Sequence, residues 1–329
     1  MTRPRVSVLL PLRNEEPYLA ECLDSLSAQT LEEHEVIVVD DGSTDGSAAI
    51  AEEHARRDAR FRVVRQEQTG MVAASERARA EARAPLIARM DADDVALPER
   101  LELQVAAIEE EGLAAVGGQV EYFPQPTDGL RDYAAWLNSL VTVEAALRDL
   151  FVECPLPGPG LMGRAELVSY RDCGWPEDYD LVFRIWCAGG RFRNVDALVH
   201  RWRDHPNRLT RTKPEYSHDA FRRCKVHFLR RTLLANGRAT VVWGAGPTGK
   251  AFARALLAAG TPVAAFVEVD PRKLGKRIHR APVVPVEQAG SFPGTLALGA
   301  VARSEGRARV RELAAAVGLV EGRDFVAVA

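Results

Sequence analysis

The feature that most constrains this chain is a strand-like run at residues 86–90 that ends abruptly in acid. Three carboxylates follow within four positions, on Asp91, Asp93 and Asp94. Like charges this close raise one another's pKa unless a cation lies among them. Mg2+ and Mn2+ prefer oxygen ligands and are commonly held by one or two carboxylates together with substrate phosphates. The alternative is an acidic turn before a helix that begins near Pro98. A position at the carboxyl end of a strand in an open α/β sheet favours a functional site.

Short apolar runs alternate with segments of helical spacing along the first part of the chain. The runs at residues 6–10, 35–39, 61–64 and 86–90 predict strands. Helices are predicted at 15–30, from the end of the turn at 40–46 to about 57, and at 71–83. Strands that alternate with helices indicate an α/β fold with a parallel sheet covered on both faces. Further along, residues 116–122 predict a strand, and the Pro/Gly-rich residues 154–164 predict a loop without regular structure.

Length and composition set the class of protein. The 329 residues are enough for two domains. A hydrophobic fraction of 47% and a formal net charge of −3 give no indication of a nucleic-acid partner. The five cysteines form no CxxC pair, so we expect neither a disulfide framework nor a zinc site. No apolar stretch approaches the roughly 20 residues of a membrane span. We therefore expect a cytoplasmic protein, with peripheral contact at the inner face of the membrane left open.

Three motifs occur in a fixed order: Val-Ser-Val-Leu-Leu-Pro-Leu-Arg-Asn-Glu at 6–15, Val-Ile-Val-Val-Asp-Asp-Gly-Ser-Thr-Asp at 36–45 and Ala-Arg-Met-Asp-Ala-Asp-Asp at 88–94. Together they resemble the family 2 glycosyltransferases of the GT-A fold, over about residues 4–210. The resemblance implies a nucleotide-diphospho-sugar transferase domain. It also implies an inverting transfer of a sugar from a nucleotide diphosphate donor, usually UDP- or dTDP-linked, with Mg2+ or Mn2+.

Carried over by position, the resemblance assigns the donor-binding residues. They are Pro11 and Asp41 for the nucleobase, Asp91 for the ribose, and Arg13 and Glu15 in the first motif. Asp93, with Asp91, would hold the metal that bridges the two phosphates. Helix capping is the alternative role for the turn that contains Asp41. The chain departs from the family at Arg13, where an aromatic residue is common, and at residues 75–76, where Arg-Asn or Leu-Asn is common.

A second acidic group lies at Glu177, Asp178 and Asp180. An inverting transfer needs a base on the far side of the sugar from the leaving diphosphate, and a carboxylate suits this task. The alternative is that acids gather in the first turn of a helix because of its dipole. The run resembles the family's Glu-Asp motif, which makes Asp178 the expected base, Glu177 its neighbour and Asp180 a weaker choice.

Residues 199–206 resemble the family's Tyr-Arg-x-His tail. By that resemblance, His205 would complete the metal shell or touch a phosphate, and Arg203 would contact the diphosphate. A surface histidine without a ligand is the alternative for His205. A bound metal would neutralise charge on the departing diphosphate.

The C-terminal part predicts a second, smaller α/β domain. A strand at 240–243, the GxGxxG turn of Gly244, Gly246 and Gly249, a helix, and a strand ending at Glu268 form a Rossmann-like unit. These four residues are a candidate second nucleotide site, for which NAD is one ligand. A structural or assembly role without a ligand is the favoured alternative. Before this domain, residues 216–236 form a basic amphipathic helix, either a connector between domains or a contact with an anionic membrane.

We therefore expect a GT-A domain at residues 1–215, a connecting helix at 216–238 and a Rossmann-like domain at 239–329. The expected activity is metal-dependent sugar transfer to a glycan or lipid-linked acceptor in cell-surface polysaccharide or glycoconjugate synthesis, by a chain that could form homo-oligomers. One rival is a nucleotide-sugar oxidoreductase or epimerase that uses NAD. The other is a nucleotide-sugar-binding scaffold without turnover.

Overall fold

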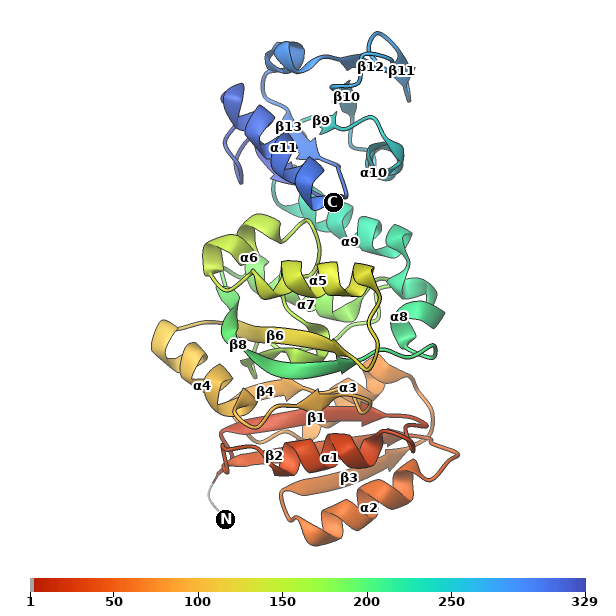
Figure 1. Ribbon diagram of the computed structural model, residues 1–329, viewed down its shortest axis with the longest axis vertical. Helices are drawn as coiled ribbons and strands as arrows, with labels where there is room; N and C mark the ends of the chain where they lie inside the picture. The colour runs from red at the N-terminus through yellow and green to blue at the C-terminus, as the bar shows by residue number, and fades with distance from the viewer. Residues whose placement is uncertain (1–2) are drawn as a thin grey trace. The chain divides into compact units, whose positions relative to one another are not determined.

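The computed structural model describes residues 3–329, and this part of the chain divides into two compact units. The first unit comprises the described residues up to Leu147 together with Pro155–Cys173 and Glu177–Thr212. The second comprises Arg148–Cys154, Gly174–Pro176 and Lys213–Ala329. Figure 1 labels the elements of both units. Residues 1 and 2, with which the first predicted domain begins, lie outside the described residues.

The first unit is built on one mixed sheet. Over residues 3–212, its strand order is β3-β2-β1-β4-β7-β6-β8-β5. The strands are β1 Val6–Leu12, β2 His34–Asp41, β3 Phe61–Gln66, β4 Leu86–Arg89, β5 Val95–Ala96, β6 Ala115–Phe123, β7 Met162–Arg164 and β8 Phe192–Arg203. The predicted strands of the first half are thus confirmed, and β3, β2, β1 and β4 are parallel.

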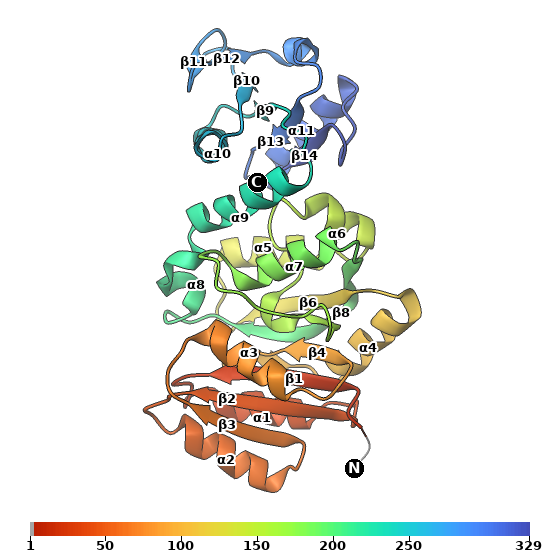
Figure 2. The ribbon, with the colours of Figure 1, turned by 180° about the vertical axis from the view of Figure 1, so that it is seen from behind.

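The apolar runs explain why the first strands lie at the centre of the unit. Every residue of β1, β2 and β4 is buried, as expected for strands covered on both faces. Helix α1 (Leu19–Ser27) buries Leu19, Cys22, Leu23 and Leu26, which recur at helical spacing. Figures 1 and 2 show α1 and α3 (Met71–Glu81) on opposite faces of the sheet.

The second half of the sheet departs from the predicted parallel arrangement. Strand β7 pairs antiparallel with both β4 and β6, and β5 pairs antiparallel with β8. Residues 154–164 were expected to lack regular structure, and that expectation is wrong at their end, which forms β7. The pairing is decided by long-range partners, since Met162 and Gly163 find their hydrogen-bond partners on strands far away in the sequence.

Short helices complete the first unit. They are α2 Ser47–Arg57, α4 Arg100–Glu111, α5 Asp128–Asn138, α6 Val143–Asp149 (whose last residues belong to the second unit), the 3-10 turn η1 Gly158–Gly160, α7 Glu177–Cys187 and α8 Leu209–Thr212. Among residues 3–329, no helix is long and apolar enough to cross a membrane.

The second unit carries its own sheet. Within residues 213–329, the strand order is β11-β12-β10-β9-β13-β14, and all pairs are parallel except β11 with β12. The strands are β9 Thr240–Trp243, β10 Val263–Val267, β11 Arg277–Ile278, β12 Ala281–Val284, β13 Leu296–Gly299 and β14 Phe325–Ala327. The helical elements are η2 Pro214–Tyr216, α9 His218–Arg231, α10 Pro247–Ala258, η3 Val286–Ser291 and α11 Ser304–Ala316.

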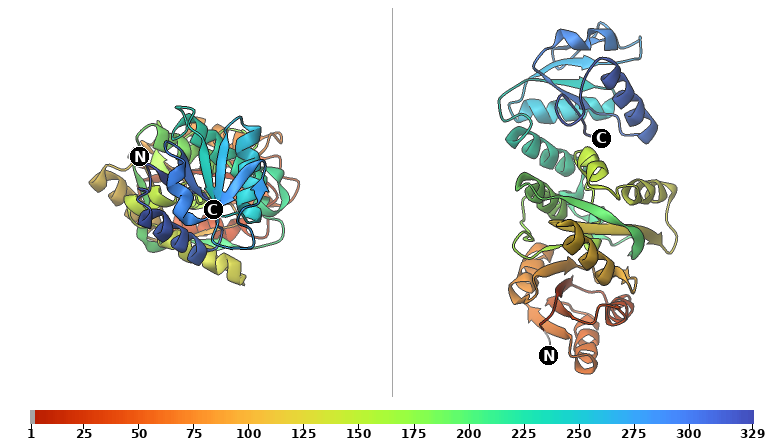
Figure 3. Two further views of the ribbon diagram at one scale, coloured as in Figure 1. Left: turned by 90° about the horizontal axis from the view of Figure 1, so that it is seen from above. Right: turned by 90° about the vertical axis from the view of Figure 1, so that its left-hand side faces the viewer.

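The chain leaves β9 toward β10 and later leaves β13 toward β14, in opposite directions along the sheet. Because parallel crossovers are right-handed, these two directions require α10 and α11 to cover opposite faces. Figure 3 shows them on the two sides of this sheet. The predicted Rossmann-like order of strand, glycine turn, helix and strand is present at β9, α10 and β10.

The core of the first unit gives a direct test of its stability. Leu10 is fully buried in the central strand β1, so we expect Leu10→Ala to lower the free energy of unfolding by about 2–5 kcal/mol. Leu103→Ala on the exposed side of α4 is the matched control, with a change within about 0.5 kcal/mol. Urea denaturation followed by circular dichroism measures both. Equal effects of the two substitutions would contradict this description of the core.

Candidate active site

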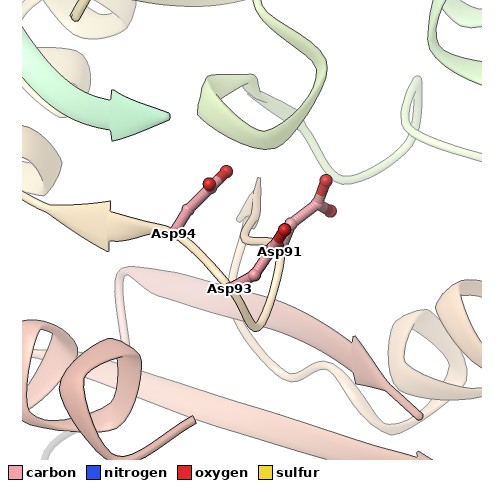
Figure 4. A group of neighbouring side chains, drawn as sticks. All are labelled: Asp91, Asp93 and Asp94. Carbon is pink, nitrogen blue, oxygen red and sulfur yellow. The ribbon is translucent and has the colours of Figure 1, made fainter. Parts of the chain in front are cut away.

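The three carboxylates of the acidic turn lie together. Asp91, Asp93 and Asp94 occupy the turn between β4 and β5, and each offers an oxygen within 4.8 Å of the others. Figure 4 shows the three side chains projecting from this turn. Asp91 and Asp93 are partly exposed, whereas Asp94 is buried. A set of carboxylate oxygens at this spacing fits a hard divalent cation.

Asp94 faces the interior and fastens the turn to strand β8. Its Oδ1 accepts a hydrogen bond from the backbone N–H of Arg203 at 2.7 Å, and its Oδ2 lies 2.9 Å from Nε2 of His200. Both side chains are fully buried. Burial, followed by the charges of Asp93 and Asp91, holds the pKa of Asp94 well above its usual range, and burial likewise holds the pKa of His200 well below its own. Asp94 is therefore the anchor of the turn.

Arg100, the first residue of α4, reinforces this anchor. It is fully buried, and its guanidinium donates to the backbone oxygens of Arg89 at 2.6 Å and Pro159 at 3.0 Å. The same group lies 3.3 Å from Nδ1 of His200. No sequence pattern indicates this role, because an arginine in the first turn of a helix ordinarily points to solvent.

Arg89 joins the acidic turn to the second acidic group. Its guanidinium donates to Oδ1 of Asp91 at 2.8 Å and lies 3.3 Å from Oε1 of Glu177. The side chain of Arg89 is buried at the end of β4. Burial raises the pKa of Asp91 even though Arg89 opposes that rise. The two candidate groups, 86 positions apart in the chain, thus belong to one site.

Asp178 packs against the loop that contains η1. A Cβ added at Gly158 would lie 2.5 Å from Oδ2 of Asp178, so a larger residue at this position would displace the carboxylate. Oδ1 of Asp178 accepts a hydrogen bond from the backbone N–H of Tyr179 at 2.7 Å. Asp180 is different, because it is fully buried and paired with Arg171 and Arg184. Asp180 therefore holds the local structure together.

His205 and Arg203 approach the acidic turn from the end of β8 and the segment after it. Nε2 of His205 lies 2.8 Å from Oδ2 of Asp93. Arg203 donates through Nε to the backbone oxygen of Asp93 at 2.6 Å. Its guanidinium also lies over the rings of Tyr18 and Phe123 at 4.8 and 4.3 Å. Both residues expected from the tail motif thus lie beside Asp93.

Glu15 adds a further carboxylate near the turn. Burial, followed by the charges of Asp93, Asp91 and Asp45, raises the pKa of Glu15 to about 8. Within residues 3–329, no group donates a hydrogen bond to this carboxylate. Several carboxylates this close together favour the binding of a cation, because its positive charge would stabilise the ionised form of each carboxylate.

Asp41 lies at the end of β2 and orders the loop before α3. Its Oδ1 accepts from the backbone N–H of Thr69 at 2.7 Å and from Gln66 at 2.8 Å, and its Oδ2 accepts from the N–H of Gly70 at 2.8 Å. Of the other donor-binding residues expected in the first motif, Pro11 is buried in β1 and Arg13 is exposed just after it.

A family model described as glycosyl transferase family 2 matches residues 7–168. The first unit is a glycosyltransferase family 2 domain. The glycosyltransferase EpsJ of Bacillus subtilis (strain 168), described as uncharacterized, is 31% identical over 219 residues, which are 63% of this chain and 63% of that relative. The match therefore spans less than two thirds of that relative's length.

Two groups of solved structures show the fold of the domain. TarS of S. aureus in complex with UDP-GlcNAc has a TM-score of 0.55 at 19% identity and covers 69% of this chain and 66% of its own. The mannosyltransferase PcManGT of Pyrobaculum calidifontis, in complex with GDP-Man and Mn2+, has a TM-score of 0.51 at 21% identity and covers 79% and 76%. The predicted GT-A fold and the family resemblance are confirmed, and a second domain with its own α/β sheet accompanies the glycosyltransferase domain.

The hydrogen bonds of Asp41 predict a pH dependence of stability in the glycosyltransferase domain. Burial alone would raise its pKa, but the bonds from Gln66, Thr69 and Gly70 lower it below the usual 3.8. A lowered folded pKa contributes stability above the unfolded pKa, and this contribution is lost as the pH falls through the folded value.

We therefore expect Asp41→Asn to cost about 1–3 kcal/mol at pH 7, because an amide cannot accept all of these bonds. The difference from the wild type should shrink as the pH falls below about 4. Urea denaturation between pH 7 and 3 measures it, with Asp132→Asn at an exposed position of α5 as control. A difference that stays constant over this range would contradict the assignment.

Proposed function

We propose that this chain is an inverting, metal-dependent glycosyltransferase that uses a nucleotide-diphosphate sugar, UDP- or dTDP-linked. The observation that carries the proposal is the contact of Arg89 with both Asp91 and Glu177, which joins a group of carboxylates that could hold a cation to a second acidic group. The complexes of TarS with UDP-GlcNAc and of PcManGT with GDP-Man support a nucleotide-sugar donor.

Asp93, Asp91 and His205 would hold Mg2+ or Mn2+. The carboxylates on the turn and the distance of 2.8 Å between His205 and Asp93 support this choice, as does the Mn2+ in the PcManGT complex. Such an ion supplies positive charge for the diphosphate that departs from the sugar. The same residues, with Pro11, Arg13, Glu15, Asp41 and Arg203, would form the donor site.

Asp178 would act as the base. In the transfer, the acceptor oxygen forms a bond to the anomeric carbon while the bond from that carbon to the diphosphate oxygen breaks, and the hydroxyl proton passes to the Asp178 carboxylate. The closeness of its carboxylate to Gly158, where a larger residue would displace it, supports this choice. Glu177, beside it, is held by Arg89 and acts as a positioning residue.

The acceptor in this proposal is a glycan or lipid-linked acceptor of cell-surface polysaccharide or glycoconjugate synthesis. A cytoplasmic location, with peripheral contact at the inner face of the membrane, goes with it. The domain boundaries after residues 215 and 238, and the capacity to form homo-oligomers, stay predictions.

Removal of Asp93 tests the metal site. We expect Asp93→Ala to weaken Mn2+-dependent binding of UDP or dTDP by about 100-fold or more, because even loss of an outer partner of a metal ligand costs about 10–100-fold. Isothermal titration calorimetry with and without Mn2+ measures this, and Asp132→Ala on the exposed face of α5 serves as control. Unchanged Mn2+-dependent affinity in Asp93→Ala would overturn the assignment.

Removal of the charge of Asp178 tests the base. We expect Asp178→Asn to keep donor affinity and to lose about 10²–10⁴-fold in turnover, which is the usual contribution of general-base catalysis. Release of nucleoside diphosphate from UDP-, dTDP- and GDP-sugars, with water as acceptor, measures turnover. Retained turnover would place the base elsewhere. Donor binding without turnover in the wild type would favour a scaffold, and hydride transfer with NAD would favour an oxidoreductase.

A further inference from the structure

The second unit contains a cavity that the proposed transfer reaction does not use. Its volume is about 360 Å3, within the range of small-molecule sites. It lies at the carboxyl ends of β9, β10 and β13 and is closed on one side by α11. Strand β10 pairs with one edge of β9, and β13 pairs with the other edge of β9. The cavity therefore lies at a topological switch point, where open α/β sheets bind ligands.

The glycine turn forms one wall of this cavity. A Cβ added at Gly249 would lie 1.9 Å from the backbone oxygen of Gly244, and Gly244 itself has a φ of +107°. Only glycine permits this close approach of the turn to the start of α10. The turn brings Gly246 and Thr248, at the positive end of that helix, to the cavity.

Glu268, the acid at the end of β10, is already fully engaged. Its Oε2 accepts from the N–H of Ala245 at 3.0 Å and from Nζ of Lys273 at 2.8 Å, while its Oε1 accepts from the N–H of Val269 and Asp270 at 2.9 and 3.2 Å. A carboxylate offers about four acceptor sites. Glu268 therefore has no acceptor left for the ribose diol of a dinucleotide, the contact that the sequence pattern suggested.

Trp243 supplies a polar group without a partner. Trp243 is one of the residues that line the cavity and is only 2% exposed, and over residues 3–329 its Nε1–H has no hydrogen-bond partner. A buried donor without an acceptor costs free energy. A ligand that accepts from this indole would remove that cost.

The side chains around the cavity define the chemistry of a ligand. Besides Glu268, the polar side chains of the wall are Trp243, Thr248, Lys273, which also donates to Glu268, and Arg309, which also pairs with Glu312. The rest of the wall is mainly valine, glycine and alanine. Such a wall suits an acceptor-rich anion that carries a flat apolar body. We propose that this cavity binds a nucleoside mono- or diphosphate, with its phosphate at the start of α10 near Lys273 and its base against the apolar wall.

The experiment uses the full chain in EDTA, so that the proposed donor site of the first unit lacks its metal and does not bind the nucleotide. Isothermal titration calorimetry with AMP, ADP, UMP, UDP, CDP, GDP and NAD measures affinity and stoichiometry. We expect at least one nucleoside mono- or diphosphate to bind with a ratio of one to one and more tightly than NAD. Absence of binding by all of them, or preference for NAD, would overturn the proposal.

Variants locate the site. Trp243→Phe keeps the ring and removes the donor, so we expect affinity to fall about three- to tenfold, the effect of one hydrogen bond. Arg309→Glu changes an exposed side chain at the cavity and should weaken binding about threefold or more. Arg323→Glu, an equally exposed arginine that does not line the cavity, is its control and should bind as the wild type does.

Asp93→Ala separates this proposal from the proposed transfer reaction. We expect it to leave nucleotide binding in EDTA unchanged while it weakens Mn2+-dependent donor binding by about 100-fold or more. Loss of both in Asp93→Ala, or unchanged affinity in both Trp243→Phe and Arg309→Glu, would place the ligand outside this cavity and refute the proposal.

Discussion

The candidate active site depends on the contacts of Arg100, whose positive charge is fully buried. Its bonds to the backbone oxygens of Arg89 and Pro159 tie the end of β4 to the loop against which Asp178 packs. Burial lowers the pKa of Arg100 to about 10, and the nearby charge of Asp94 limits that fall. A buried charge is tolerated only when its donors are satisfied and opposite charge is close. The acidic turn and this arginine therefore stabilise one another.

The three carboxylates of the turn point to different partners. Asp94 points inward to His200, Asp91 is held by Arg89, and Asp93 lies beside His205. Asp91 and Asp93 therefore each have a partner side chain while they stay partly exposed. The positions that would receive a cation are thus set before the cation arrives, which reduces the entropy lost on binding.

Sequence reasoning found the parts of this protein that local patterns encode. The apolar runs of β1 and β2 were visible because strands buried on both faces are mostly apolar, and the turn after β4 was visible because three carboxylates end such a run. It missed Arg89, Arg100 and His200, since a buried charged residue is identified only by partners far away in the chain. It missed β7 for the same reason, because that strand exists through its pairing with β4 and β6. It anticipated Glu268 as a ligand contact, whereas this carboxylate is occupied by the protein's own donors.

The second unit is assembled from separate pieces of the chain. Residues 148–154 belong to it although residues 155–173 of the first unit follow them in the chain. Asp149 in that piece pairs with Arg311, and Val152 accepts a hydrogen bond from Lys225. The polypeptide thus enters this unit, leaves it and returns. Replacement of residues 213–329 alone would therefore remove Arg311 and Lys225, and with them their contacts to Asp149 and Val152.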